Sequence, residues 1–361
     1  MSTQVSQAAA KETMALSKAS KKRRASPGWR IWYRFKESKR GYYSLWIFSI
    51  LFVLSLGAEF LSNDKPILVI YEEGYYFPIF KEYPETVFGG DFETETDYND
   101  PYMQEILTTN GNSIIFALNR YSYDSINLET DHPNPAPPSE YNLLGTDDRG
   151  RDVLARLIYG FRLSVIFAFV LTAIGLFIGI LAGALQGYLG GRFDLYAQRV
   201  IEVWASMPEL YLLIIFASIF EPSIILLIVL LSAFGWMGLS DYVRAEFLRG
   251  RNMDYIKAAR AMGVSNRSII FHHLLPNSMT PVITFLPFRI SGAILLLTSL
   301  DFLGLGVPPD TPSLGELLSQ GKENIEAWWL SISTFIVLVG TLILLIFVGD
   351  GIREAADPRR N

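Results

Sequence analysis

The stretch "RLSVIFAFVLTAIGLFIGILAGALQG", residues 162–187, decides the fold. Its only charged residue is Arg162, at the first position. A bilayer core is about 30 Å thick, and roughly 20 mostly apolar residues cross it as an α-helix, which satisfies every backbone hydrogen bond within the segment. We therefore expect a transmembrane helix here.

Five further apolar runs have a similar character, and they cover residues 44–61, 196–220, 223–243, 279–300 and 328–349. Pro208 and Pro287 interrupt two of them and predict kinks, because proline has no amide hydrogen to donate. Charged residues make up 19% of the chain, against about a quarter in soluble proteins. We predict an all-α polytopic membrane protein with six transmembrane helices. The first run, 44–61, resembles a cleaved signal peptide, but its preceding 43 residues favour a retained anchor.

The distribution of charge predicts the orientation of these helices, since Lys and Arg collect on the cytoplasmic side. The leader, 1–43, has eleven Lys or Arg against two acids, whereas residues 62–145 have fifteen acids against three Lys or Arg. We expect the leader in the cytoplasm, 62–145 in the periplasm, and both termini cytoplasmic, with 351–361 as a short tail. The basic run at 21–24 is interpreted as a topology signal, and binding to anionic lipid is the alternative.

Residues 62–145 are too many for a passive connector. The run "PILVIYEEGYYFPIF" is typical of strands, and we expect a small insert of mixed α/β or β-rich structure between the first two transmembrane helices. The stretch "GTDDRGRD" then combines turn-forming residues with charges, and we predict an outer collar at 146–160 before the second helix. Hydrogen bonding within the collar is favoured over a metal site, and its predicted residues are Gly145, Thr146, Asp147, Gly150, Arg151 and Asp152.

The stretch "DYIKAARAMGVSNRSIIFHHLLPN", residues 254–277, has the local pattern of a helix-turn-helix. Four small or apolar residues fall on one predicted face, Tyr255, Ala258, Ala259 and Met262. Gly263 is expected to end the first helix in a left-handed conformation, and Ser265 to cap the second about three residues before a membrane span. A net charge of -5 and this short tether to the membrane argue against DNA binding. We predict a cytoplasmic elbow that either transmits movement from a soluble partner or only packs on its own bundle.

Charges inside membrane spans are costly and point to function. Glu209 and Arg289 have similar predicted depths, so we expect them to pair across the bundle, or Arg289 to border a path through the bundle and meet the carboxylate of a ligand. No phosphate-binding Gly-Lys-Ser/Thr motif occurs, so any ATP must be hydrolysed by another subunit. The adjacent His272 and His273 diverge on a helix, and cysteine is absent, so we predict no metal site and no bound cofactor.

"KAARAMG", followed nine residues later by "HLLP", resembles the EAA loop of ATP-binding-cassette (ABC) importer permeases. The stretches "LLGTDDRGRDVLARLIYGFRLS" and "LDFLGLGVPPDTPSLGELLSQGK" resemble the C-type subunit of the oligopeptide and dipeptide permease family. The insert, with "FGGDF", is similar to that of YejE-type permeases of microcin C and oligopeptide importers. The resemblance implies that the elbow docks on an ATPase through the residues Asp254, Lys257, Ala258, Ala259, Gly263, Leu275 and Pro276. Lys257 and His273 depart from the usual residues of the motif.

The family further implies a type I ABC importer permease in the bacterial inner membrane, moving oligopeptides or peptide antibiotics such as microcin C inward. The expected partners are a second YejB-like permease subunit, a YejF-like ATPase that carries ATP and Mg, and a YejA-like periplasmic peptide-binding protein. Nucleic acid is not expected as a partner. The alternatives are a membrane-anchored receptor or scaffold, and a permease for a dipeptide or nickel-type substrate.

Overall fold

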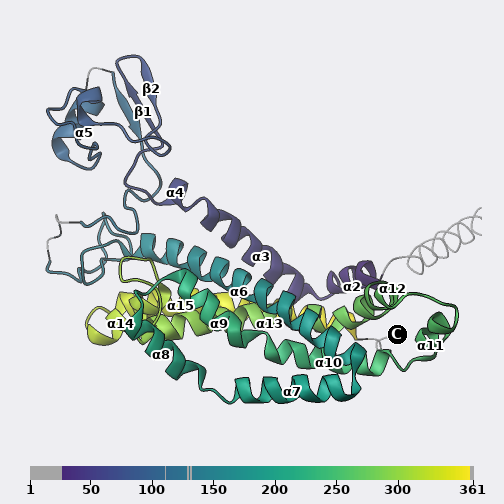
Figure 1. The fold of residues 1–361 in the computed structure, drawn as a ribbon. Coiled ribbons are helices and arrows are strands. Elements are labelled where there is room, and N and C mark those ends of the chain that lie inside the picture. Colours follow the sequence, from purple (N-terminus) through teal and green to yellow (C-terminus); the bar gives the residue numbers. More distant parts are fainter. Residues whose placement is uncertain (1–26, 110, 128–129, 131, 358–361) are drawn as a thin grey trace, which may run out of the picture.

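The computed structural model describes residues 27–109, 111–127, 130 and 132–357. Most of the predicted leader and the last four residues of the predicted tail lie outside these residues. The chain forms a bundle of long helices, and a small α/β insert stands beyond one end of it (Figure 1).

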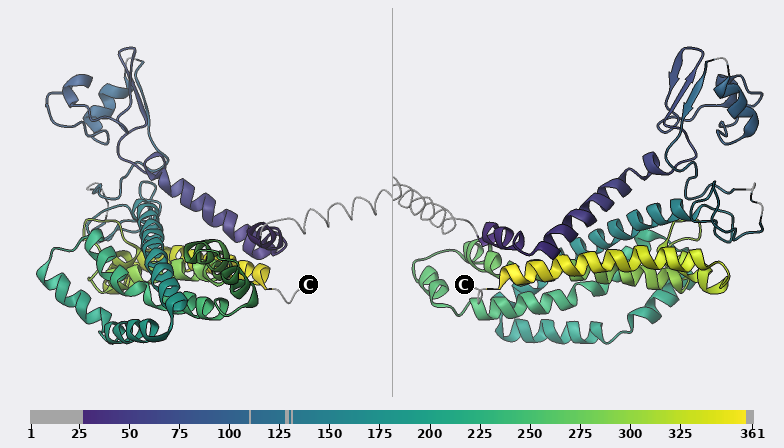
Figure 2. Two further views of the ribbon diagram at one scale, coloured as in Figure 1. Left: turned by 45° about the vertical axis from the view of Figure 1, so that its right-hand side comes forward. Right: turned by 180° about the vertical axis from the view of Figure 1, so that it is seen from behind.

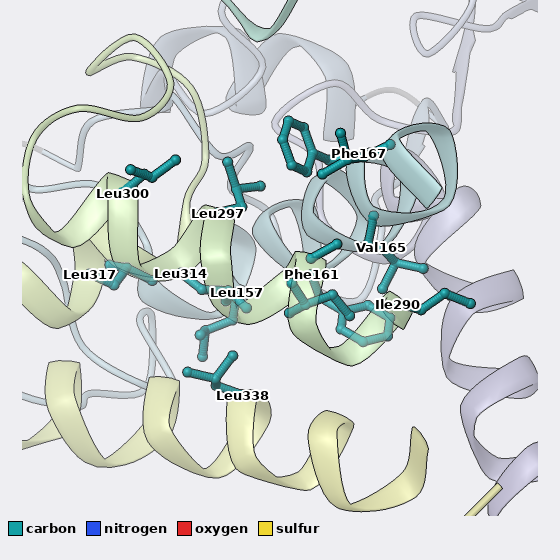
Figure 3. Close-up of a cluster of buried hydrophobic side chains, with 14 of the residues drawn as sticks. Leu157, Phe161, Val165, Phe167, Ile290, Leu297, Leu300, Leu314, Leu317 and Leu338 are labelled. Carbon is teal, nitrogen blue, oxygen red and sulfur yellow. The ribbon is translucent and has the colours of Figure 1, made fainter. Parts of the chain in front are cut away.

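Three long helices form the centre of the bundle: α6 (Val153–Leu189), α13 (Leu275–Phe302) and α15 (Trp328–Ala356). The short α14 (Leu314–Glu323) closes the end where α6 begins. Figure 3 shows apolar side chains from these four helices pointing toward one another. This cluster is the main core, and its fully buried members include Val165, Leu297 and Leu317.

Within the described residues, four helices are long and apolar enough to cross a membrane, over Val153–Leu189, Ile224–Gly250, Asn266–Phe302 and Trp328–Ala356. A fifth results if α7 (Gly191–Ala205) and α8 (Glu209–Ile219), bent by 61°, count as one broken span. The remaining predicted span, residues 44–61, corresponds mainly to α3 (Lys39–Leu56). This helix has 18 residues and begins with Lys39 and Arg40, which lower its mean hydropathy below that of the four long helices. The count of six therefore stays a prediction.

The structure shifts several predicted boundaries. The run 196–220 bends at the predicted Pro208, by 61°, and the bend separates two helices, because Pro208 stands as the N-cap of α8. The run 223–243 continues to Gly250 through α9 (Ile224–Gly235) and α10 (Met237–Gly250). Residues 153–160 of the predicted collar form the first turns of α6, which begins at Val153, and α15 runs past the predicted start of the tail to Ala356.

A stripe of glycines holds α6 tightly against α10. Gly179, Gly183 and Gly187 are spaced four residues apart, so they share one face of α6. A Cβ atom added at Gly187 would lie 2.5 Å from the Cβ of Phe247, and one added at Gly179 would lie 2.9 Å from the carbonyl oxygen of Trp236. Small residues at this spacing let two helix backbones approach closely, as in membrane helix pairs generally.

The insert folds around a three-stranded antiparallel sheet with the order β2-β1-β3. β1 (Leu68–Tyr71) and β2 (Gly74–Tyr76) form a hairpin, and β3 (Ser113–Ile115) pairs with the other edge of β1. The 3₁₀ helix η1 (Glu85–Phe88) and the helix α5 (Pro101–Thr108) complete it. Its small core contains Val69, Phe88, Tyr98, Met103 and Leu107.

The described chain begins with α2 (Pro27–Phe35), which packs on the last turns of α15 through Phe35, Val348 and Ala355. The left view of Figure 2 shows α2 nearly end-on beside α3, which is seen from its side, so the chain turns sharply between them. After α3, the short α4 (Ala58–Leu61) leads into the insert.

Candidate functional site

The predicted elbow lies at the opposite end of the bundle from α14, and it contains α11 (Asp254–Ala261) and α12 (Asn266–Ser268) (Figure 1). Gly263 adopts φ +80°, the left-handed conformation predicted for the end of the first helix. The Ser265 hydroxyl accepts from the amide of Ser268 at 3.4 Å, so the predicted N-cap is confirmed. The Asp254 carboxylate accepts from Lys257 at 3.4 Å, in an exposed pair.

The two faces of α11 differ from the prediction. Ile256 and Ala259 are buried, at 0% and 5% exposure, whereas Ala258 is exposed and Met262 is 76% exposed. The prediction that Ala258 and Ala259 share one exposed face is therefore wrong. Ala259 lies three residues after Ile256, on the same side of the helix, and both are buried. The outward face of α11 is formed by Tyr255, Ala258 and Met262.

Tyr188, in the last turn of α6, ties the elbow to the bundle. Its hydroxyl donates to the Asn266 side-chain oxygen at 2.5 Å, and its carbonyl accepts from Arg251 at 3.2 Å. The guanidinium of Arg260 lies over its ring, 5.6 Å from the centroid. The Asn277 amide also reaches the Tyr255 hydroxyl at 3.5 Å. α11 is thereby linked to α6 through the contact of Arg260 with Tyr188, and to α13 through the hydrogen bond of Tyr255 with Asn277.

The second helix of the elbow is continuous with α13, so that Asn266–Phe302 is one helix of 37 residues. The predicted separation of about three residues is wrong. A π-helical turn, Ile269–Leu274, carries the backbone into α13 just before Pro276, which cannot donate to the preceding turn. Leu275 is half-buried there and Pro276 is exposed.

At the other end of the bundle, the predicted collar residues Asp147 and Arg151 belong to a buried ion network. The Asp147 carboxylate accepts from the side chain of Arg151 at 2.7 Å, and Arg151 also donates to Glu316 of α14 at 3.2 Å. Arg156, in the first turn of α6, donates to Glu316 at 2.5 Å and lies 3.5 Å from Asp147. Arg156 and Asp147 are both fully buried.

The carboxylate of Asp152 joins the collar to the insert. It caps α6 by accepting from the Ala155 amide at 2.8 Å, and it accepts from the side chains of Asn119 and Asn142 at 2.7 and 2.9 Å. Burial raises the pKa of Asp152, and these hydrogen bonds oppose the rise. The Asn119 amide also donates to Ser62, where the chain enters the insert.

Glycine and threonine shape the loop that carries these carboxylates. Gly145 and Gly150 take φ values of +74° and +81°, as turn formers can. The Thr146 hydroxyl donates to Asn134 at 2.9 Å, and the indole of Trp329 donates to the Thr146 carbonyl at 3.1 Å. The loop is thereby fixed to the start of α15.

Sequence reasoning missed Arg156 and Glu316. A charged residue in the first turn of a long apolar helix was a signal for Arg156. No local signal pointed to Glu316, which lies 160 positions along the chain from Arg156.

The expected ion pair between Glu209 and Arg289 does not occur in this structure. Arg289 instead donates to the backbone carbonyl of Gly235 at 2.5 Å, and Glu209 lies in the first turn of α8. Within the described residues, no three His, Asp or Glu side chains are placed to hold a metal ion.

Comparison with known proteins agrees with this architecture. Residues 175–361 match the family described as "Binding-protein-dependent transport system inner membrane component". The chain is 52% identical to the inner membrane ABC transporter permease protein YejE of Escherichia coli strain K12, over 91% of this chain and 96% of that protein. It is 46% identical to the peptidoglycan transport system permease protein YejE of Agrobacterium fabrum, over 92% and 93% of the two chains.

A more distant relative is the dipeptide transport system permease protein DppC of Haemophilus influenzae, which is 36% identical over 62% of this chain and 78% of that protein. The two YejE proteins extend the similarity through the insert, whereas the DppC alignment covers less of this chain. The chain therefore belongs to the family of binding-protein-dependent ABC transporter permeases of the inner membrane, within the group that includes the YejE proteins.

Proposed function

We propose that this permease forms half of the path of an ATP-driven importer for short peptides, including peptide antibiotics such as microcin C. The names of its relatives describe dipeptide and peptidoglycan transport, so the chemistry they share is that of short peptides. A dipeptide substrate is the second candidate, supported by the similarity to DppC. A second YejB-like permease subunit supplies the other half of the path, and a YejA-like protein delivers the peptide.

The elbow carries this proposal. Its face of Tyr255, Ala258 and Met262 is exposed, while Ile256 and Ala259 are buried against the bundle on the opposite face. A YejF-like ATPase that docks on the free face transmits nucleotide-driven closure to α11. Tyr188 and the continuous Asn266–Phe302 helix pass that movement to α6 and α13. The population of inward- and outward-open states then shifts with the nucleotide state.

We further propose six spans with both termini in the cytoplasm. The counts of Lys and Arg support a cytoplasmic position for α11 and a periplasmic position for the insert. ATP and Mg are bound by the ATPase, and this chain needs no cofactor of its own.

The test is peptide uptake in cells that lack this chain and are complemented by variants. Ala258→Asp places a charge on the free face of α11, and uptake is expected to fall to near background while the ATPase no longer copurifies. Ala258→Ser, which changes size little and adds no charge, is the matched control and is expected to retain both. Full uptake and full copurification with Ala258→Asp would refute docking at this face.

Competition in the same assay identifies the substrate. Unlabelled peptides of two to six residues, peptidoglycan-derived peptides and Ni²⁺ are added against one labelled peptide. Inhibition by the longer peptides supports the main proposal, inhibition by dipeptides alone supports the second candidate, and competition only by Ni²⁺ contradicts both.

A further inference from the structure

Helix α2 has one face packed on the protein and another that is bare. Phe35, only 2% exposed, packs against Val348 and Ala355 of α15. On the other side, Trp29 and Tyr33 are 53% and 46% exposed, and their rings meet edge to face at 5.2 Å. Tryptophan and tyrosine suit the boundary of a bilayer, since their rings are apolar and their N–H or O–H groups remain hydrated.

Basic side chains follow this aromatic pair along the chain, with Lys36 just past the end of α2 and Lys39 and Arg40 in the first turn of α3. Lys36, Lys39 and Arg40 are exposed, and none of them forms an ion pair with a carboxylate among the described residues. Residues 27–43 contain five Lys or Arg against a single acid, Glu37. We call Trp29, Tyr33, Lys36, Lys39 and Arg40 together the α2 surface. Its charge fits an anionic partner.

The α2 surface is continuous with a face of α3 that none of the described residues covers. Tyr43, Trp46, Ile47 and Ile50 are about half exposed or more, and they follow one another at helical spacing. The apolar stripe thus begins where the basic residues end. Figure 2 shows the sharp turn between α2 and α3, which a helix lying along the membrane surface needs before a helix that enters it.

We propose that the α2 surface binds the headgroups of anionic phospholipids and so enriches them beside this subunit. The inference rests on the proposed placement of α3 in the bilayer with this end on the cytoplasmic side. Amphipathic helices with basic and aromatic residues bind at the headgroup level, and each Lys or Arg near an anionic surface strengthens partitioning about fivefold. Contact with α15 holds the helix at the surface, so the charges select which lipids gather there.

The absence of cysteine from the chain provides a clean test. The full chain, with Tyr33→Cys carrying the only fluorophore, is reconstituted in nanodiscs of phosphatidylglycerol and phosphatidylcholine in a 3:7 ratio, taken as roughly the anionic content that gives a strong surface potential. In one sample the phosphatidylglycerol carries a nitroxide quencher near its headgroup, and in a second sample an equal mole fraction of phosphatidylcholine carries it. The proposal predicts about threefold or more stronger quenching by the labelled phosphatidylglycerol.

Two variants separate charge recognition from general proximity to lipid. Replacing Lys36, Lys39 and Arg40 by Gln should bring the ratio of the two quenching efficiencies to about one, as should high salt. The leader then still carries eight Lys or Arg, eleven minus three, so the topology signal remains. The matched control replaces Arg192, Arg199 and Arg249, which are exposed and lie outside the α2 surface, by Gln, and it should leave the ratio unchanged.

Equal quenching by the two lipids, or the same ratio in both triple variants, would overturn the proposal. A further sample contains the added ATPase. If quenching by both labelled lipids falls only when the ATPase is present, and to the same extent for each lipid, the α2 surface binds a protein partner instead. The result is independent of peptide uptake and of ATPase copurification, so a failure here is distinguishable from a failure of the proposed function.

Discussion

Glu316→Gln should destabilise the permease strongly. The collar network contains two buried guanidiniums, Arg151 and Arg156, and two carboxylates, Asp147 and Glu316, so its charges balance. The substitution keeps the shape of the side chain and leaves two buried cations with one carboxylate. Breaking a buried pair typically costs 3–5 kcal/mol, and the 20% exposure of Glu316 places the expected loss near the lower end, at about 3 kcal/mol.

A double-mutant cycle isolates the ion pair from other contacts. Arg156→Met also loses hydrogen bonds to the carbonyls of Tyr123 and Thr311, so its own effect is not the energy of the pair. The double variant Arg156→Met/Glu316→Gln retains the balanced pair of Arg151 and Asp147. We expect it to be more stable than the sum of the single effects predicts, by about 2 kcal/mol.

The assay is equilibrium unfolding of the full chain in mixed detergent micelles, followed by tryptophan fluorescence. Glu323→Gln, an exposed position on the same helix α14, is the matched control and should change the free energy of unfolding by less than about 0.5 kcal/mol. Additivity of the two single variants within about 0.5 kcal/mol would refute the coupling.

Two further predictions concern packing and titration. Gly187→Val should force α6 from α10, because its Cβ would lie 2.5 Å from that of Phe247, and should cost about 1–3 kcal/mol in the same unfolding assay, whereas Gly238→Ala, with open space around it, should not. Burial raises the folded-state pKa of Asp152, so its contribution to stability is greatest below pH 3.8 and is lost as pH rises through the folded pKa. The stability of the unmodified chain relative to Asp152→Asn should therefore fall from pH 4 to pH 7, and a flat or rising difference would contradict this.

Local chemistry predicted the local features of the elbow well. Gly263 and Ser265 were identified because left-handed glycines and serine caps act within a few residues of themselves. The orientation of α11 was not predictable in the same way. Its eight residues carry small or apolar side chains on several sides, and only the buried position of Ile256 reveals which side faces the protein.

Contacts between residues far apart in the chain could not be predicted from the sequence. The guanidinium of Arg289 donates to the backbone carbonyl of Gly235. Every residue has such a carbonyl, so the pattern of side chains does not predict this partner. Glu316 completes the collar from a different helix. By contrast, the apolar runs predicted most of the long helices, because a helix that crosses the bilayer needs about 20 consecutive apolar residues, and such a run is visible in the sequence.

The continuous helix Asn266–Phe302 acts as a lever. Its 37 residues give it a length of about 55 Å, and a rotation of roughly 5° about its midpoint would displace each end by about 2 Å in opposite directions. One end carries Asn266, held by Tyr188. The other carries Asp301, whose carboxylate accepts from the amide of Val307 and from the hydroxyl of Ser313, the cap of α14. A small displacement of the elbow is thereby expected to reach the start of α14, the helix that carries Glu316, at the opposite end of the bundle.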